Sequence, residues 1–228
     1  MLVFQPAHFK LRKHFEKWLN ETGFYQKFHF YNLGITSVYG PKLSPRIWDI
    51  TFWFCCFGFY GKYFSRFLKT YKSNFVFVDV GANAGLYSLI AGQNHYCVHS
   101  HCFEPDPTTS RFLTKNIELN NAKNISAHHY AIADKRGQKQ VSVNQYHSGS
   151  LSLDAPSPTV EERYTVSIEC VNASDLSDII PTTEQELIIK IDVEGYERVV
   201  IGELLKCEFA QHIEHVYFEA GGSKENIE

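Results

Sequence analysis

A glycine turn between an apolar strand and a helix constrains this chain more than any other feature. Residues 75–92 read FVFVDVGANAGLYSLIAG. The β-branched and aromatic residues from Phe75 to Val80 predict a buried parallel strand, and apolar residues at helical spacing follow Gly85. A strand that passes through glycines into a helix brings backbone N–H groups close to a ligand. Asp79 at the tip of the strand favours a ligand with a positive end over a bare phosphate.

The glycine spacing excludes two common nucleotide-binding turns. A dinucleotide fingerprint reads G-x-G-x-x-G, but Asn83 and Leu86 occupy the second and third glycine positions here. A phosphate loop requires a lysine directly after its last glycine, and Gly85 is followed by Leu86. The remaining pattern, D-x-G-x-x-x-G, resembles motif I of the S-adenosylmethionine (SAM) methyltransferases. An ordinary tight turn without a ligand is the alternative interpretation.

Strand and helix patterns alternate after Phe75, which predicts an α/β fold with a mostly parallel sheet and helices on both faces. We expect parallel strands at 75–80, 98–103, 125–132, 187–193 and 215–219, with helices near 85–92, 106–120 and 196–205. Asp106 and Pro107 form a favourable helix start, as the N-cap and the first helical residue. An antiparallel insertion is predicted from two alternating segments and the loop between them: 141–145, 164–171 and 148–158.

Residues 1–74 are rich in Phe, Tyr and Trp and differ in composition from the rest of the chain. The span 10–19 has the spacing of an amphipathic helix, and 34–45 is typical of a loop or short strands. Helix is also predicted over 48–68, at least from Tyr60 onward. We interpret the whole segment as a cap that packs on the main domain.

The composition of the 228 residues is that of a globular protein, with 44% hydrophobic residues and a net charge of −3. Basic residues form no stripe, so we predict no nucleic-acid partner. The six cysteines show neither a C-x-x-C motif nor a regular framework, and we interpret them as reduced core thiols. The first residues do not resemble a signal peptide, which together with the thiols predicts a cytoplasmic protein. The oligomeric state is left open.

Metal and membrane sites have little support in the sequence. His99 and His101 would share one face of a strand, but no third ligand is spaced to join them, so we expect no metal site. The most apolar stretch, 47–60, contains Asp49 and is too short to span a bilayer. We therefore expect no stable membrane insertion and interpret the stretch as a core-packing helix.

Acidic residues stand at or just after the ends of the predicted parallel strands, where ligands bind in such sheets. They are Asp79, Glu104, Asp134, Asp192 and Glu219. Glu104 falls 19 positions after Gly85, a spacing that suits hydrogen bonds from ribose hydroxyls, although a surface Glu-Pro turn is the alternative. Asp134 would similarly reach an adenine amino group, or only begin a turn.

The fourth predicted strand carries a lysine and two acids of the same parity. Lys190, Asp192 and Glu194 would all face one side if the strand stays regular to its end. Lys190 lies in an apolar run and needs a partner, for which Asp192 is the nearest candidate. The pair is either structural or catalytic. In the second case Asp192, Glu194 or a Lys190 with a lowered pKa would accept the proton of a substrate hydroxyl.

Several segments together resemble the FkbM-type SAM-dependent methyltransferases. They lie at 75–92, 102–121, 130–138, 169–180 and 187–204, with a weaker match at 216–222. The G-A-N-x-G at 81–85 and the K-I-D-V-E-G-x-E at 190–197 make the resemblance specific. It implies a Rossmann-like class I methyltransferase fold, SAM as the methyl donor, and O-methylation of a hydroxyl on a glycan or small-molecule acceptor. We expect a transfer that needs no metal.

The resemblance also implies roles for single residues. The cofactor-binding residues, from the methionine and ribose region to the adenine side, would be Asp79, Gly81, Asn83, Gly85, Glu104 and Asp134. Among these, Glu104 would hold the ribose. Asp192 and Glu194 would face the transferred methyl group, and Lys190 is the third catalytic candidate.

The resemblance ends early. The fold of the family continues after its fifth strand with a helix and an antiparallel strand pair, whereas this chain stops at Glu228, about nine residues after Glu219. We expect either a fragment or an N-terminal segment, 1–74, that covers the exposed edge. In the first case the methyltransferase domain at 75–228 is C-terminally truncated. A non-catalytic SAM-binding or scaffold protein is the main alternative function, and a nicotinamide-dependent oxidoreductase is a weaker one.

Overall fold

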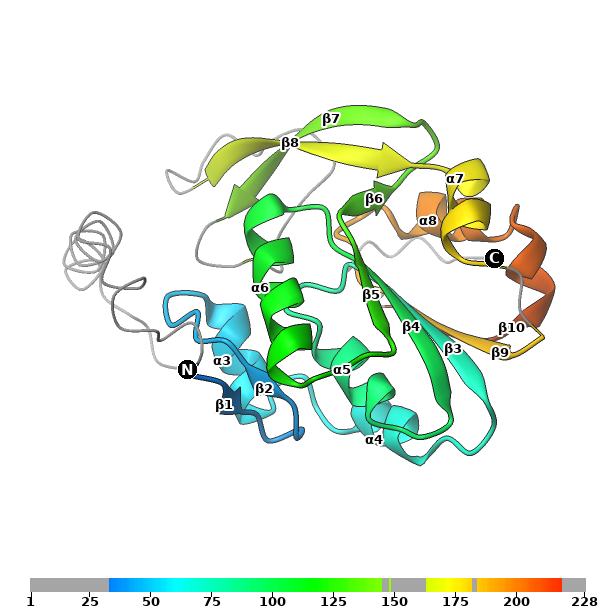
Figure 1. Ribbon diagram of the computed structural model, residues 1–228. Coiled ribbons are helices and arrows are strands. Elements are labelled where there is room, and N and C mark those ends of the chain that lie inside the picture. The colour runs from blue at the N-terminus through cyan, green and yellow to red at the C-terminus, as the bar shows by residue number, and fades with distance from the viewer. Residues whose placement is uncertain (1–32, 145–147, 149–162, 182–183, 219–228) are drawn as a thin grey trace.

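The computed structural model describes residues 33–144, 148, 163–181 and 184–218. Their centre is a five-stranded parallel sheet with the strand order β10-β9-β3-β4-β5 (Figure 1). The strands are β3 (Phe75–Val80), β4 (Cys97–Phe103), β5 (Ile125–His128), β9 (Glu186–Ile191) and β10 (Ile213–Phe218). The strands are added from β3 to β5 on one side and from β9 to β10 on the other, so the strand order switches between β3 and β9. Such a switch opens a crevice at the carboxyl ends of the two strands, and the predicted parallel sheet is confirmed.

Helices cover both faces of this sheet, as predicted. One face packs against α3 (Ile50–Phe57), α4 (Tyr63–Thr70), α5 (Leu86–Gly92) and α6 (Pro107–Leu119). The other packs against α7 (Ala173–Ile179), α8 (Glu197–Leu204) and the 3₁₀ helix η3 (Glu208–His212). Along β3, Phe75 and Phe77 enter the first core, whereas Val76 and Val78 enter the second. This alternation explains why the strand is apolar throughout, since both of its faces are buried.

The ends of the predicted helices follow local chemistry. Asp106 caps α6 by accepting a hydrogen bond from the backbone N–H of Thr109 at 2.8 Å, and Pro107 is the first helical residue. A helix that the sequence analysis did not predict, α7, begins with a capping box between Asn172 and Asp175. Its seven residues are too few for a clear helical period.

The prediction of one strand over 125–132 was wrong. The strand is interrupted at His129, and β6 (Tyr130–Ile132) leaves the main sheet and pairs with β8 (Arg163–Val171). The antiparallel partner of β8 is β7 (Gly137–Asn144), which confirms the predicted insertion. The break has a packing reason: Ala131 joins the core of the small β6-β8-β7 sheet, whereas Ile132 stays in a core of the main sheet.

The described part of the N-terminal segment packs on the first core. It contains a short hairpin of β1 (Ile35–Thr36) and β2 (Lys42–Leu43), followed by α3 and α4. The stretch predicted as helical over 48–68, at least from Tyr60 onward, contains two helices, because Gly58 adopts the left-handed conformation at φ +85° and ends α3. The amphipathic helix predicted at 10–19 lies outside the described residues.

The cysteines and the helix lengths bear on two further predictions. All six cysteines are buried and free of disulfides, as expected of core thiols. Among the described residues, no helix is both long and apolar enough to cross a bilayer.

Candidate active site

The glycine turn after β3 requires glycine at two positions. Gly81 has φ +75°, and a Cβ atom there would lie 2.0 Å from the carbonyl oxygen of Asp192. Gly85 has φ +78°, and its Cβ would lie 2.4 Å from Cδ1 of Leu113 on α6. The loop after β9 is held against the turn, because the N–H of Asp192 donates to the carbonyl of Val80 at 3.0 Å. Only glycine allows these two segments to approach so closely.

The N–H groups of this turn are already used within the protein. Those of Gly81 and Ala82 both donate to the carbonyl of Phe103, at 3.0 and 2.9 Å. The N–H of Asn83 donates to the carboxylate of Glu104 at 2.9 Å, and that of Gly85 to the carbonyl of Ala82 at 2.8 Å. The turn therefore offers a ligand its shape and a neighbouring carboxylate, in place of the free N–H donors expected from the sequence.

Glu104 is a buried acid at the end of β4. Its side chain accepts the N–H of Asn83 through Oε2 and the N–H of Asp106 through Oε1, at 2.9 and 3.0 Å. The residue is only 6% exposed. Burial raises the pKa of Glu104 to about 7, against the lowering effect of the two N–H donors. Its carboxyl group therefore changes charge near neutral pH.

A cavity lies where β3, β4 and β9 end. The residues that line it are Tyr60, Val80, Gly81, Asn83, Phe103, Glu104, Pro105, Tyr130, Ala131, Ile132, Ser148, Asp192, Val193, Glu194 and Tyr196. Five predicted site residues thus meet here: Gly81, Asn83, Glu104, Asp192 and Glu194. The cavity encloses about 70 Å³. Ligand pockets usually measure about 300 Å³ or more, so a nucleoside would extend beyond the enclosed part.

Three predicted cofactor residues, Asp79, Gly85 and Asp134, lie outside the wall of this cavity. Asp79 is fully buried, accepts a hydrogen bond from Oγ of Ser88 at 2.8 Å, and pairs with Lys190 at 3.2 Å. Asp134 is exposed and accepts a hydrogen bond from the hydroxyl of Tyr196 at 3.4 Å. Asp79 therefore supports the site through its ion pair with Lys190. Asp134 is linked to the cavity through Tyr196, which lines the cavity. Glu219 lies outside the described residues.

Lys190 is a buried cation held between two carboxylates. Its Nζ lies 3.2 Å from Oδ1 of Asp79 and 3.2 Å from Oδ2 of Asp192, and it donates to the carbonyl of Gly81 at 3.2 Å. Burial lowers the pKa of Lys190, but the two opposite charges and their hydrogen bonds outweigh it and raise the pKa above its ordinary value. This direction is opposite to the alternative in which Lys190 has a lowered pKa and accepts the proton. Lys190 stays protonated and positions Asp192, whose side chain remains 39% exposed.

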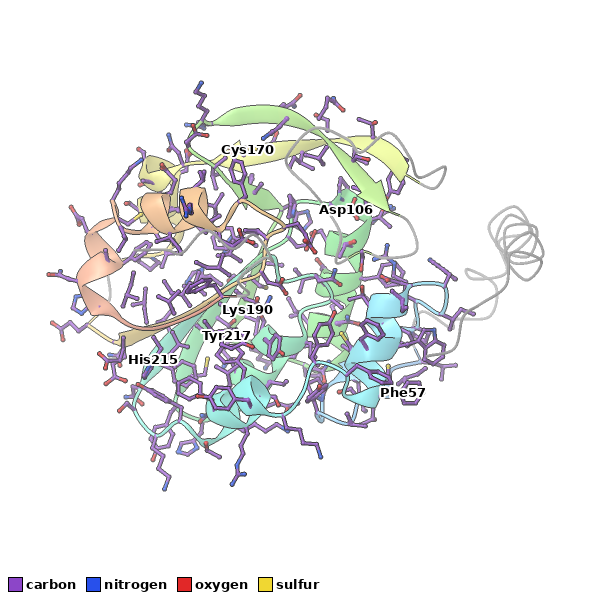
Figure 2. The ribbon with its side chains drawn as sticks, turned by 180° about the vertical axis from the view of Figure 1, so that it is seen from behind. Phe57, Asp106, Cys170, Lys190, His215 and Tyr217 are labelled. Carbon is purple, nitrogen blue, oxygen red and sulfur yellow. The ribbon has the colours of Figure 1, made fainter. Side chains whose placement is uncertain are left out.

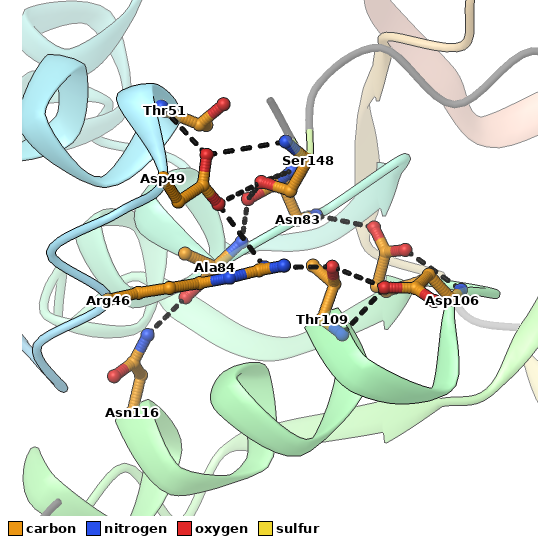
Figure 3. Close-up of polar contacts among 10 residues, drawn as sticks. Arg46, Asp49, Thr51, Asn83, Ala84, Asp106, Thr109, Asn116 and Ser148 are labelled. Carbon is orange, nitrogen blue, oxygen red and sulfur yellow. Dashed lines mark hydrogen bonds and ion pairs between the residues drawn. The ribbon is translucent and has the colours of Figure 1, made fainter. Parts of the chain in front are cut away.

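A buried polar network, which the sequence analysis did not predict, joins the N-terminal segment to the glycine turn (Figure 3). Arg46 pairs with Asp49 at 3.2 Å, and Oγ of Ser148 donates to Asp49 at 2.5 Å. Nδ2 of Asn83 in turn donates to Oγ of Ser148 at 2.9 Å. The only sequence signal was the acid Asp49 within an apolar stretch, since an acid there needs a buried partner.

A second cavity adjoins the first. It measures about 270 Å³ and is lined by Phe59, Tyr60, Tyr87, Lys190, Ile191, Asp192 and Tyr217. Two of these residues, Lys190 of β9 and Tyr217 of β10, are labelled in Figure 2. Tyr60 and Asp192 line both cavities. The two spaces are therefore neighbours that share these two side chains as walls.

The parallel sheet, the glycine turn and the acid at the end of the next strand define a class I methyltransferase. The chain belongs to the FkbM methyltransferase family, because residues 79–228, more than half of its length, match the Methyltransferase FkbM domain. SAM is the cofactor of this chain. The site fits that group, since Gly81 leaves a side-chain-free wall and Glu104 supplies a carboxylate suited to ribose hydroxyls.

Individual proteins that resemble this chain share less than a quarter of their aligned residues with it. The protein Methyltransferase 1 of Beauveria bassiana (strain ARSEF 2860) is 24% identical over 139 residues, which are 54% of this chain and 56% of that protein. Among solved structures, the methyltransferase FkbM of Methylobacillus flagellatus KT is 18% identical, with 59% of this chain and 29% of that chain covered and a TM-score of 0.39. The precorrin-6y C5,15-methyltransferase of Geobacter metallireducens GS-15 is 11% identical, with 68% and 59% covered and a TM-score of 0.38. The chain thus spans little more than half the length of the curated relative.

Proposed function

We propose that this protein transfers the methyl group of SAM to a hydroxyl group of a glycan or small metabolite. The observation that carries the proposal is the position of Asp192, which lines both the cavity with the glycine turn and the adjoining cavity. A carboxylate at that junction can touch a cofactor and an acceptor at the same time. The family membership supports methyl transfer, and the choice of a hydroxyl acceptor rests on this geometry.

The cofactor would lie in the first cavity. Gly81 and Asn83 would face its methionine and ribose region. Glu104, in its ionised form, would accept hydrogen bonds from the ribose hydroxyls. Gly85 acts through the shape of the turn, since it lies at the start of α5. Asp134 would hold the adenine side together with Tyr196, to which it is hydrogen-bonded.

The reaction needs alignment and the removal of a proton. SAM supplies an electrophilic methyl group on a sulfonium, and alignment alone can accelerate its transfer by several orders of magnitude. Asp192 would accept the proton of the acceptor hydroxyl, and Glu194 is the second candidate because it lines the first cavity. Lys190, with Asp79 behind it, would hold Asp192 in place.

Calorimetric titration with SAM and S-adenosylhomocysteine, followed by transfer of a labelled methyl group to a panel of hydroxyl compounds, tests the proposal. We expect both nucleosides to bind and at least one hydroxyl compound to be methylated. Glu104→Gln should weaken binding of both, whereas Glu118→Gln, at an exposed position of α6, should leave it unchanged. Failure of both nucleosides to bind would contradict the proposal. Binding without turnover on any acceptor would favour a non-catalytic SAM-binding protein.

A further inference from the structure

The second cavity has walls of aromatic rings that come from distant parts of the chain. Phe59 and Tyr60 lie in the connection between α3 and α4, Tyr87 lies on α5, and Tyr217 lies on β10. Three of them keep large exposed fractions although they are aromatic: 71% for Phe59, 40% for Tyr217 and 39% for Tyr60. Exposed apolar rings gathered around a hollow mark a place where a ligand is bound.

These rings are held in fixed positions by packing. The ring of Tyr217 stacks on that of Phe64, with 4.2 Å between centroids and 11° between planes. Tyr87 meets the same Phe64 edge-on at 5.2 Å, and Tyr60 meets Tyr87 edge-on at 6.5 Å. Phe64 itself is only 4% exposed and belongs to the main core. The cavity therefore presents preformed flat surfaces, which favour a planar or ring-shaped ligand.

The charges at the base of this cavity disfavour an anionic ligand. The Lys190 ammonium group forms ion pairs with Asp79 and Asp192, each at 3.2 Å, and donates to the carbonyl of Gly81 at 3.2 Å. One positive charge stands between two negative ones, so the group carries a net charge of −1. Among the residues that line the cavity, only Lys190 is cationic, and its charge is already offset by Asp79 and Asp192. An anion buried there would lack a partner.

We propose that this cavity is the acceptor site and that it takes an uncharged ring that carries a hydroxyl group. The flat face of the ring would lie against Tyr217 or Phe59, and the hydroxyl would donate to Asp192. The inference rests on the proposed methyl transfer and names the chemical class of its acceptor. Both a saccharide and a phenol present this chemistry, and anionic versions of either would be excluded.

The step balances within the groups named. The acceptor oxygen forms a new bond to the methyl carbon while the bond between that carbon and sulfur breaks. The bonding electron pair remains on sulfur, which leaves as the neutral thioether of S-adenosylhomocysteine. The hydroxyl proton passes to the Asp192 carboxylate, which is paired with Lys190 at 3.2 Å.

Ligand-observed NMR on the full chain saturated with S-adenosylhomocysteine tests the inference with two matched pairs of probes. The first pair is methyl glucoside and methyl glucuronoside, and the second is 4-methylphenol and 4-hydroxybenzoate. Within each pair the principal difference is a carboxylate. We expect the neutral member of at least one pair to bind and its anionic partner to bind about tenfold more weakly or not at all. The pair that binds identifies the ring as a saccharide or a phenol.

A variant pair locates the site. Tyr217→Ala should weaken the neutral probe about tenfold, because it removes a stacking surface, and should leave S-adenosylhomocysteine affinity unchanged. Tyr63→Ala is the matched control, since Tyr63 is 82% exposed on α4 and does not line the cavity. If Tyr217→Ala does not fold, the affinity of the neutral probe is measured in Phe59→Ala, which should fold because Phe59 is 71% exposed.

Three results would overturn the inference while S-adenosylhomocysteine still binds. They are equal binding of the neutral and anionic members, binding of none of the four probes, and unchanged probe affinity in both Tyr217→Ala and Phe59→Ala. Loss of S-adenosylhomocysteine binding in the unmodified chain is a different result, because it contradicts the proposed function on which the inference rests.

Discussion

The two cavities that meet at Asp192 are built by different means. The first is shaped by the backbone, with the glycine at position 81 against the carbonyl of Asp192 and a buried acid, Glu104, whose carboxylate is tied to two N–H groups. The second is shaped by side chains such as Phe59 and Tyr217, which remain partly exposed. The cofactor cavity therefore has almost no freedom to vary, whereas the acceptor cavity can change its walls without changing the fold.

The polar network of Arg46, Asp49 and Ser148 adds to this difference. It braces the first cavity from the N-terminal segment and contacts Asn83 in the turn. Hydrogen bonds between buried polar groups hold one geometry, because breaking such a bond leaves a buried group unsatisfied. Substitutions around the first cavity should therefore have larger effects than those around the second.

The largest effect is expected at Gly81. In Gly81→Ala the new Cβ would lie 2.0 Å from the carbonyl oxygen of Asp192, so the loop after β9 must move. We expect a loss of about 3 kcal/mol in the free energy of unfolding and no detectable S-adenosylhomocysteine binding, measured by denaturant unfolding and calorimetry. Gly61→Ala is the matched control, with φ +73° and no atom within 4 Å of the added Cβ. It should lose about 1 kcal/mol and keep the affinity.

Asp192→Asn should affect turnover more than cofactor binding. The variant keeps the shape of the side chain but removes the carboxylate that would accept the proton, so we expect the rate to fall by about 10²- to 10⁴-fold. Measurement of labelled methyl transfer under single-turnover conditions gives the effect on the chemical step. Glu194→Gln, which alters the first cavity alone, should slow the reaction less. A larger effect in Glu194→Gln would reverse the two assignments.

Glu104 should make cofactor binding depend on pH. Burial raises the pKa of Glu104 to about 7, so the carboxyl group ionises as the pH rises through that value. Since the ionised form accepts hydroxyl hydrogen bonds better, S-adenosylhomocysteine affinity should rise between about pH 6 and about pH 8, by at most tenfold per pH unit. Calorimetry across this range should find no such rise in Glu104→Gln. The same dependence in Glu104→Gln would assign it to another group.

The stability of the free protein should change in the opposite direction. A raised pKa means that the folded state holds the Glu104 proton more tightly than the unfolded state does. This stabilising contribution is complete below the ordinary glutamate pKa and is lost as the pH rises through about 7. The proton therefore stabilises the free fold, and its release favours the cofactor.

Ser148→Ala should give the smallest effect of the series. It removes the hydroxyl that donates to Asp49 at 2.5 Å and accepts from Asn83 at 2.9 Å, so we expect a loss of about 1 to 3 kcal/mol in the free energy of unfolding. S-adenosylhomocysteine affinity should fall only a few-fold, because Glu104 is unchanged. Ser177→Ala on the exposed side of α7 is the control and should be neutral. Equal stability of the two variants would show that the network is dispensable.

Local pattern predicted the parts of the fold that local chemistry controls. The alternation of strands and helices, the cap at Asp106 and the antiparallel insertion follow from side-chain period and turn residues within short stretches. The interruption at His129 was missed because it depends on which distant segment offers a partner. The end of α3 at Gly58 was missed although its cause, a glycine in the left-handed conformation, is local. The short helix α7 was missed for a simpler reason, because seven residues show little period.

The amino-acid sequence by itself determined the glycine turn, the acid that follows it at Glu104 and the family of the chain. These depend on backbone conformation and on spacing along one stretch of chain. Only the tertiary structure decided that Asp79 is fully buried, that Lys190 stays charged, and that Tyr217 and Asp192 line one cavity. The physical reason is that burial, charge pairing and enclosure arise between residues far apart in sequence, where periodicity carries no information.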